Sequence, residues 1–157
     1  MRSNVVLETR SLSMHFGGVV AVDRVDFSLR ENELRCLIGP NGAGKSTFFK
    51  CITAQLRPTA GDVVIRDFNV TGSESHQVAR MGVGIKTQVP NVFDGLDVEE
   101  NIWLSASQSA SVKRARVITS EVIERLELGE VRKSQLGSVA HGQRQPVELG
   151  MVLAGEP

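Results

Sequence analysis

Residues 39–47 read Gly39-Pro40-Asn41-Gly42-Ala43-Gly44-Lys45-Ser46-Thr47. The mainly apolar run Leu34-Arg35-Cys36-Leu37-Ile38 comes before this stretch, and Phe48-Phe49-Lys50-Cys51-Ile52 follows it. The pattern G-x-x-x-x-G-K-[ST] between a strand and a helix is typical of a phosphate-binding loop. The alternative is a glycine-rich turn without a ligand. Because every fixed position of the pattern is filled and both flanks are suitable, we favour the phosphate-binding loop.

Each residue type in this loop has a chemical purpose. Gly42 and Gly44 allow the backbone to bend so that successive amides point into one concavity, where a phosphate can lie. The N-terminus of the following helix adds positive field. Lys45 is placed to reach the β- and γ-phosphates, and the Ser46 hydroxyl is placed to bind Mg²⁺. The sequence therefore predicts binding of a nucleoside triphosphate with Mg²⁺.

Bulk properties limit the remaining functions. The chain has 157 residues, with 18 basic and 18 acidic side chains, so its size suits one domain with a sizeable core. A formal net charge of zero does not indicate nucleic acid or an anionic membrane surface as a partner. Its apolar runs are short, so we expect neither a transmembrane helix nor a signal peptide. Cys36 and Cys51 lack metal-ligand spacing, and we expect both to be buried in a protein of the cytoplasm.

The N-terminal third alternates apolar and polar residues, which predicts a patch of antiparallel strands. Gly17-Gly18 predicts a turn within it. Phe16, just before this turn, has two interpretations: it packs on its own sheet, which the residues alone favour, or it stacks on a base. The strands are expected at residues 5–12, 19–22 and 25–29, followed by a buried strand at residues 34–38.

Helices dominate the second half. Asp97-Val98-Glu99-Glu100 has capping-box spacing, so a helix should begin there. Pro146 fits only the first turn of a later helix, which places that start near Gly142 or Gln143. Lys113, Arg114 and Arg116 are interpreted as a solvated helix end in preference to a binding patch. Further elements are expected as strands at residues 62–65 and 84–88 and as helices at residues 75–81 and 111–128.

Four features in this order resemble the ATP-binding cassette (ABC) transporter ATPases. They are Phe16-Gly17, the phosphate loop, a glutamine after a strand at Gln88, and His141-Gly142-Gln143 at a late helix start. The resemblance covers the chain from about Val5 to Pro157. The motifs are most similar to cassettes of branched-chain amino acid and urea importers, and Leu34–Ile38 and Val92-Phe93 lean toward the urea type.

The resemblance implies a role for each matching position. Phe16 would stack on adenine, which reverses the preference drawn from the residues alone. Gln88 would reach the metal and the attacking water. Ala140, His141, Gly142 and Gln143 would form the signature that closes over the γ-phosphate held by a second ATP-binding subunit. The phosphates of ATP and Mg²⁺ would be held by Gly39, Pro40, Asn41, Gly42, Ala43, Gly44, Lys45, Ser46 and Thr47.

Two positions depart from the family pattern. Ala140 replaces the signature serine, which removes a hydroxyl donor worth about 1.5–3 kcal/mol toward a charged group. Thr87 stands where the family usually has an aromatic residue. The family's next strand, which ends in Asp-Glu and supplies the general base, has no counterpart in the 157 residues. We therefore expect a cassette truncated before that strand, able to bind ATP but not to hydrolyse it.

The predicted fold class is α/β: a phosphate-loop ABC ATPase core spanning residues 1–157, with an N-terminal antiparallel β patch and a helical insertion at about residues 98–138. The resemblance implies an ATPase subunit that drives uptake. Its implied partners are transmembrane permease subunits, a second ATP-binding subunit and, indirectly, a solute-binding protein, at the inner face of the cell membrane. The alternatives are a nucleotide-binding module without turnover and a soluble ABC protein that serves no transport.

Overall fold

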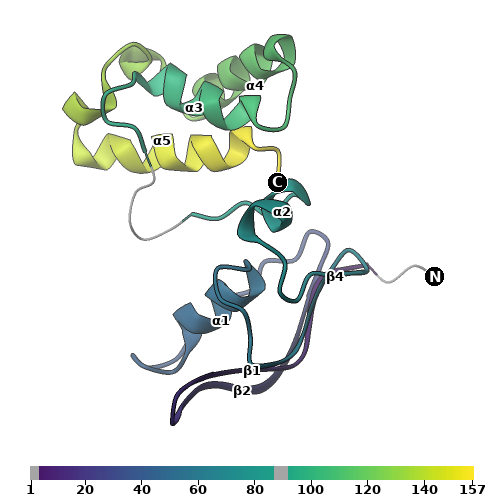
Figure 1. Cartoon of the computed structure of the whole chain (residues 1–157). Helices are drawn as coiled ribbons and strands as arrows, with labels where there is room; N and C mark the ends of the chain where they lie inside the picture. The colour runs from purple at the N-terminus through teal and green to yellow at the C-terminus, as the bar shows by residue number, and fades with distance from the viewer. Residues whose placement is uncertain (1–3, 87–91) are drawn as a thin grey trace. The chain divides into compact units, whose positions relative to one another are not determined.

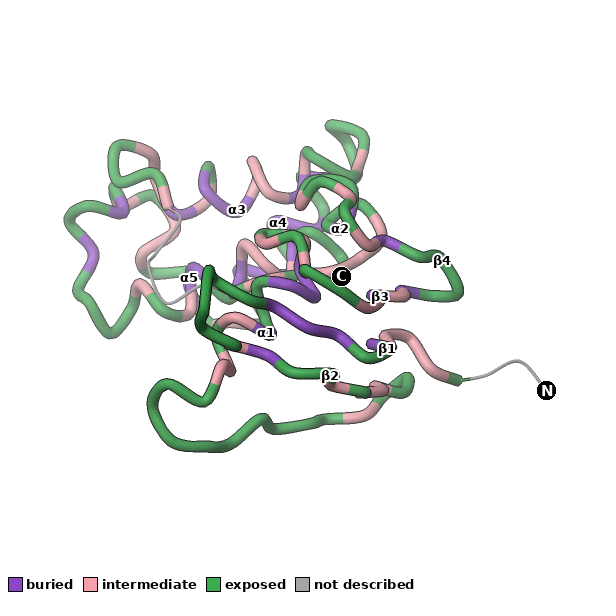
Figure 2. The backbone as a smooth tube through the Cα atoms, turned by 60° about the horizontal axis from the view of Figure 1, so that its bottom comes forward, coloured by how far each residue is buried: buried purple, intermediate pink, exposed green. Residues whose placement is uncertain are grey.

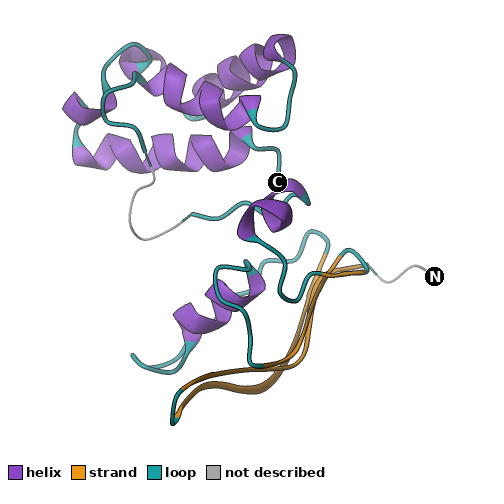
Figure 3. Cartoon of the chain, viewed as in Figure 1, coloured by secondary structure: helices purple, strands orange, loops and turns teal. Residues whose placement is uncertain are grey.

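The computed structural model describes residues 4–86 and 92–157. The chain divides into two compact units, Met1–Met81 and Gly82–Pro157, and each is described by itself. Among the described residues, every strand belongs to the first unit, and the second unit is built from helices (Figure 3). The mixture of strands and helices agrees with the predicted α/β class, and two helices, Lys45–Ile52 and Ser75–Arg80, lie in the first unit as well.

The first unit contains one antiparallel sheet of four strands in the order β2-β1-β3-β4 (Figure 1). Strands β1 and β2 form a hairpin around Gly17-Gly18, and Gly17 has a φ of 57°, which suits a glycine in a tight turn. This confirms the predicted antiparallel patch. The strand bounds are Val5–Phe16 for β1, Val19–Arg30 for β2, Ala60–Ile65 for β3 and Phe68–Asn69 for β4.

Strand β2 runs without interruption through the residues that the sequence divided into two strands. The alternation fails near Arg24 because the hairpin contains a bulge there: Arg24 has a φ of 44°, and its amide donates to the Ser13 Oγ at 2.9 Å. A second irregularity lies opposite, where the Ser11 amide donates to the Asp26 carboxylate at 2.6 Å. A bulge disturbs the side-chain pattern locally without ending the pairing.

The predicted buried strand at residues 34–38 is wrong. These residues form no strand, Leu34 is 92% exposed and Ile38 is 89% exposed, and Cys36 is exposed as well. Figure 2 shows the tube between β2 and helix α1 (Lys45–Ile52) as exposed along most of its length. An apolar run becomes a strand only when a neighbour completes its hydrogen bonds. None of the four described strands pairs with this run.

Helix α1 (Lys45–Ile52) packs on the sheet through its buried face. Phe48 meets the Phe27 ring of β2 edge-on, with centroids 5.5 Å apart. Cys51 is buried as predicted, and burial raises the pKa of its thiol. Helix α2 (Ser75–Arg80) follows, closely matching the predicted helix at residues 75–81. The apolar core of this unit comprises Leu12, Met14, Val22, Phe48, Cys51, Ile52, Val63, Ile65, Val70 and Val78.

The second unit packs α3 (Val98–Ser107), α4 (Val112–Arg125) and α5 (His141–Ala154) around one apolar core. Two short 3-10 turns, η1 (Gly129–Val131) and η2 (Leu136–Ser138), connect α4 to α5. None of the helices in the described part of the chain is both long and apolar enough to span a membrane. The core includes Val98, Ile102, Ala106, Ala115, Ile118, Val122, Ile123, Leu128, Leu136, Val139, Val147 and Ala154.

The predicted capping box at Asp97 is confirmed. The Asp97 carboxylate accepts from the Glu100 amide at 2.7 Å, and the Glu100 carboxylate accepts from the Asp97 amide at 2.9 Å. Helix α5 begins at His141, slightly earlier than predicted, so Pro146 is its sixth residue and lies beyond the first turn. The predicted strand at residues 84–88 does not form at residues 84–86, and its other two residues lie outside the described chain.

Asn101 fixes the turn that leads into α3, which makes its amide a test of this fold. It is fully buried, accepts from the Phe93 amide at 2.9 Å, and donates to the carbonyls of Phe93 and Asp97 at 3.0 and 2.9 Å. We expect Asn101→Leu to lower the free energy of unfolding by about 1–3 kcal/mol, because these backbone groups lose their partner. Urea denaturation measures the loss. The control Ser120→Leu, on the exposed face of α4, should change it by less than about 0.5 kcal/mol; equal losses would contradict this interpretation.

Candidate functional site

The glycine-rich loop is shaped by its contact with strand β2. Gly42 and Gly44 have φ values of 83° and 79°, in the left-handed region, and Gly44 is the N-cap of α1. A Cβ at Gly44 would lie only 2.0 Å from the Ala21 carbonyl oxygen of β2. Glycine is therefore required at position 44 for two reasons: the backbone is left-handed, and a side chain would collide with the Ala21 carbonyl. This matches the predicted reason for glycine in the loop, a sharp backbone bend before a helix.

Lys45 is folded over the beginning of the loop. Its Nζ donates to the carbonyl of Gly39 at 2.7 Å and to that of Pro40 at 2.6 Å. The first turn of α1 contains no acidic residue, so the field of the helix N-terminus is not neutralised locally. A lysine ammonium, two left-handed glycines and a helix N-terminus together form a cradle whose charge suits a phosphate. The residues present therefore fit a phosphate group such as those of a nucleoside triphosphate.

Ser46 and Thr47 occupy the first turn of α1, where Ser46 is exposed and Thr47 is half-buried. An exposed hydroxyl beside the phosphate cradle fits the predicted oxygen ligand for Mg²⁺. Within the described residues, no group of three or more His, Cys, Asp or Glu side chains could hold a metal ion by itself. The second predicted metal ligand, Gln88, lies outside the described residues, as does Thr87.

Phe16 ends β1 at the tip of the hairpin, opposite Val19. It is 47% exposed, so its own sheet covers only part of the ring. The same hairpin supports the glycine loop through Ala21. Phe16 and the glycine loop therefore both contact or belong to the β1–β2 hairpin. The role of Phe16 as an aromatic that stacks on a base stays a prediction.

The predicted signature residues lie at the N-terminus of α5. Ala140 is the N-cap and supplies no side-chain hydrogen bond, while the amides of Gln143 and Arg144 donate to its carbonyl at 2.9 and 3.2 Å. Ala140, His141, Gly142 and Gln143 are all exposed. The first turn has no acidic residue, so this second helix N-terminus also suits an anion. It belongs to the second unit, whereas the glycine loop belongs to the first.

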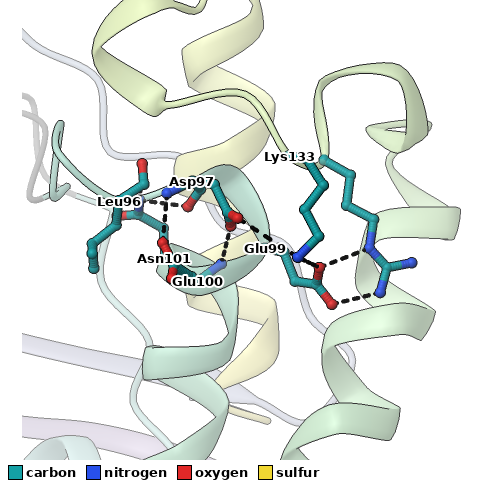
Figure 4. A network of polar contacts seen from close by, with 7 residues as sticks. Leu96, Asp97, Glu99, Glu100, Asn101 and Lys133 are labelled. Carbon is teal, nitrogen blue, oxygen red and sulfur yellow. Dashed lines mark hydrogen bonds and ion pairs between the residues drawn. The ribbon is translucent and has the colours of Figure 1, made fainter.

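A charged network fixes the segment that leads to α5 (Figure 4). Glu99 of α3 accepts from Arg132 at 3.0 and 2.5 Å and from the Lys133 ammonium at 2.5 Å. The hydrogen bond from Arg132 and then that from Lys133 lower the pKa of Glu99 to about 2. In return, Glu99 raises the pKa values of Arg132 and Lys133. These bonds attach residues 132–133 to the start of α3.

Further contacts connect three parts of the second unit: the 3-10 turn η2, the loop before α3, and helix α5. The amides of Leu136 and Gly137 donate to the carbonyls of Leu96 and Asp94, both at 2.9 Å. Arg144 of α5 donates to the Leu136 carbonyl at 3.2 Å and forms an ion pair with Asp94. The sequence interpretation missed this role of Asp94 and Arg144. The two residues are 50 positions apart, so neither local spacing nor periodicity could reveal their contact.

The fold is that of ATP-binding cassettes of known structure. A nucleotide-free ATP-binding cassette from an ABC transporter superposes with a TM-score of 0.82 at 25% identity, over 98% of this chain and 66% of that one. A cassette in its ADP conformation gives a TM-score of 0.84 at 25% identity, over 99% of this chain and 66% of that one.

The sequence comparisons identify the family. The ABC transporter family model matches residues 22–157. The high-affinity branched-chain amino acid transport ATP-binding protein LivG of Salmonella typhimurium is 33% identical over 99% of this chain and 67% of its own length. The corresponding protein BraF of Pseudomonas aeruginosa is 28% identical over the same shares of both chains. The chain belongs to the ABC transporter family, and it spans about two thirds of the length of these relatives.

The network around Glu99 predicts how stability depends on pH. The pKa of Glu99 lies below its ordinary value of 4.5 in the folded chain, at about 2. Its ionised form therefore stabilises the fold fully above pH 4.5, and this contribution is lost as the pH falls toward 2. We expect Glu99→Gln to lower stability at neutral pH and to flatten the dependence between pH 4.5 and 2. Urea titrations across this range measure the slope.

A matched control is Glu124→Gln, which removes an exposed carboxylate of α4 that is not part of the ion pairs of Arg132 and Lys133. For Glu124→Gln, the free energy of unfolding should change with pH between 4.5 and 2 as it does in the unmodified chain. If Glu99→Gln leaves the slope unchanged as well, the network does not stabilise the fold.

Proposed function

We propose that this chain is an ATP-binding subunit of an importer for branched-chain amino acids, and that residues 39–47 hold ATP with Mg²⁺. The observation that carries the proposal is the cradle formed by Gly42, Gly44 and Lys45 at the N-terminus of α1. Amino acids are favoured over urea because LivG and BraF carry branched-chain amino acid transport in their names.

The residues of the site would share the work as follows. Lys45 leaves the carbonyls of Gly39 and Pro40 to bind the β- and γ-phosphates, and the loop amides hold the β-phosphate. Ser46 and Gln88 contact Mg²⁺, which neutralises phosphate charge when bound. Phe16 stacks on adenine, with the exposed part of its ring as the contact face.

The N-terminus of α5 would act on the nucleotide of a second subunit. Ala140, His141, Gly142 and Gln143 are exposed and face no acidic residue within their own helical turn, which supports a role as an anion site between subunits. Closure of such a pair would be transmitted to transmembrane permease subunits, served by a solute-binding protein, at the cytoplasmic face of the membrane.

The loop assignment can be tested at Lys45. We expect Lys45→Ala to weaken binding of Mg-ATP roughly tenfold to a hundredfold, because a charge-assisted bond to phosphate is worth about 1.5–3 kcal/mol. Isothermal titration calorimetry measures the affinity. Lys50→Ala is the matched control, since it removes an exposed lysine from the last turn of the same helix. Similar affinities for both variants would refute the phosphate-loop proposal.

A second candidate is a nucleotide-binding module without turnover. The observation that favours it is Ala140, which offers no hydroxyl to a γ-phosphate at the N-cap of α5. We expect a 157-residue polypeptide of this sequence to show no ATP hydrolysis above background, because its sequence lacks an apolar strand that ends in Asp-Glu. Phosphate release measures the rate. Turnover that disappears in Lys45→Ala would show that hydrolysis does not need that segment.

A further inference from the structure

Helix α5 is attached by two ion pairs on neighbouring turns. Near its N-terminus, Arg144 pairs with Asp94. One turn later, Glu148 accepts from the Lys86 ammonium at 2.7 Å. Residues four apart in a helix lie on the same face, so Arg144 and Glu148 form their ion pairs from the same face of α5. Lys86 and Asp94 stand on either side of residues 87–91, so two chain segments separated by these residues meet the same face of α5.

In each pair the side chain on α5 is largely covered, whereas the Lys86 and Asp94 side chains are 43% and 64% exposed. The Glu148 side chain is only 9% exposed, which requires a partner for its charge. Arg144 is mostly covered as well, and its guanidinium also donates to the Leu136 carbonyl through Nε and Nη2, both at 3.2 Å. A planar guanidinium can serve both acceptors at once, whereas a lysine ammonium could not reproduce this fork.

The backbone around Arg144 explains what the contact would position. The Arg144 amide and the Gln143 amide both donate to Ala140, the N-cap of α5. The Leu136 carbonyl, which accepts from the Arg144 guanidinium, lies in η2, four residues before Ala140. In the same turn, the Gly137 amide donates to the Asp94 carbonyl. The guanidinium therefore connects the residues on both sides of Ala140 to the loop before α3.

We propose that Arg144 and Glu148 are positioning residues that hold the N-terminal turn of α5, residues 140–143, against the chain segments at Lys86 and Asp94. The proposal deepens the proposed function and rests on it for its consequence. An anion site at a helix N-terminus works only if its amides keep a fixed direction, and these two pairs supply that direction from outside the helix.

Hydrogen exchange of the 157-residue chain without nucleotide tests the positioning directly. We expect Arg144→Gln to accelerate exchange of the Gln143, Arg144, Leu136 and Gly137 amides at least about tenfold. The amides of Ile118, Thr119, Val122 and Ile123 in α4 should change less than about twofold, since these residues are buried. Asp94→Asn should accelerate the same four amides to a smaller extent, because the bond to Leu136 remains. Glu148→Gln should also accelerate the Gln143 and Arg144 amides, to a smaller extent than Arg144→Gln, because its pair with Lys86 lies one turn beyond them.

Three further variants separate positioning from a general loss of stability. Arg144→Lys keeps the charge opposite Asp94 and should protect these amides better than Arg144→Met, whose unbranched side chain is of similar length but uncharged. A purely steric role would not distinguish Lys from Met. Arg116→Gln, an exposed arginine of α4, should leave all of these amides unchanged. No acceleration in Arg144→Gln, or equal acceleration throughout the second unit, would overturn the proposal.

The proposed function is checked separately with Mg-ATP binding to the unmodified chain and to Arg116→Gln. If neither binds Mg-ATP, the proposed function fails while the exchange result still decides the positioning. If both bind but Arg144→Gln shows unchanged exchange, the positioning fails and the proposed function stands.

Discussion

The close approach of Gly44 to the Ala21 carbonyl is the constraint on which the loop depends. At this point the chain must pass beside β2 and enter α1 with a left-handed backbone. Any other residue would meet a carbonyl oxygen and a strained conformation together. The hairpin therefore determines where the first turn of α1 lies, and with it the positions of Lys45 and Ser46.

Lys45 extends this constraint to the other end of the loop. Because its ammonium is bound by Gly39 and Pro40, the side chain joins the beginning of the loop to the beginning of the helix. The Lys45 ammonium thus links the two ends of the loop. A phosphate that enters the loop exchanges two neutral carbonyl acceptors for charged oxygens, and bonds to charged groups are the stronger ones.

The sequence predicted those parts of the fold whose signals are local. The glycine pattern, the capping box at Asp97 and the Gly17-Gly18 turn each depend on residues within a few positions, and each is found as expected. The wrong prediction at residues 34–38 came from treating apolar composition as burial, although burial depends on a neighbour distant in sequence. Arg144 and Asp94 were missed for the same reason, since their contact joins segments 50 residues apart.

The exposed run before the loop also shows which contacts the cradle needs. Leu34 and Ile38 lie open to solvent, yet Gly44 has a left-handed backbone and the Lys45 ammonium donates to the Gly39 carbonyl. The shape of the loop in this chain therefore follows from the hairpin, from α1 and from Lys45, without a paired strand at residues 34–38. The first turn of α5 is comparable: no side chain caps it, and contacts with residues outside the helix define it. In both places the first turn of the helix contains no acidic residue, and residues outside that helix help to define it.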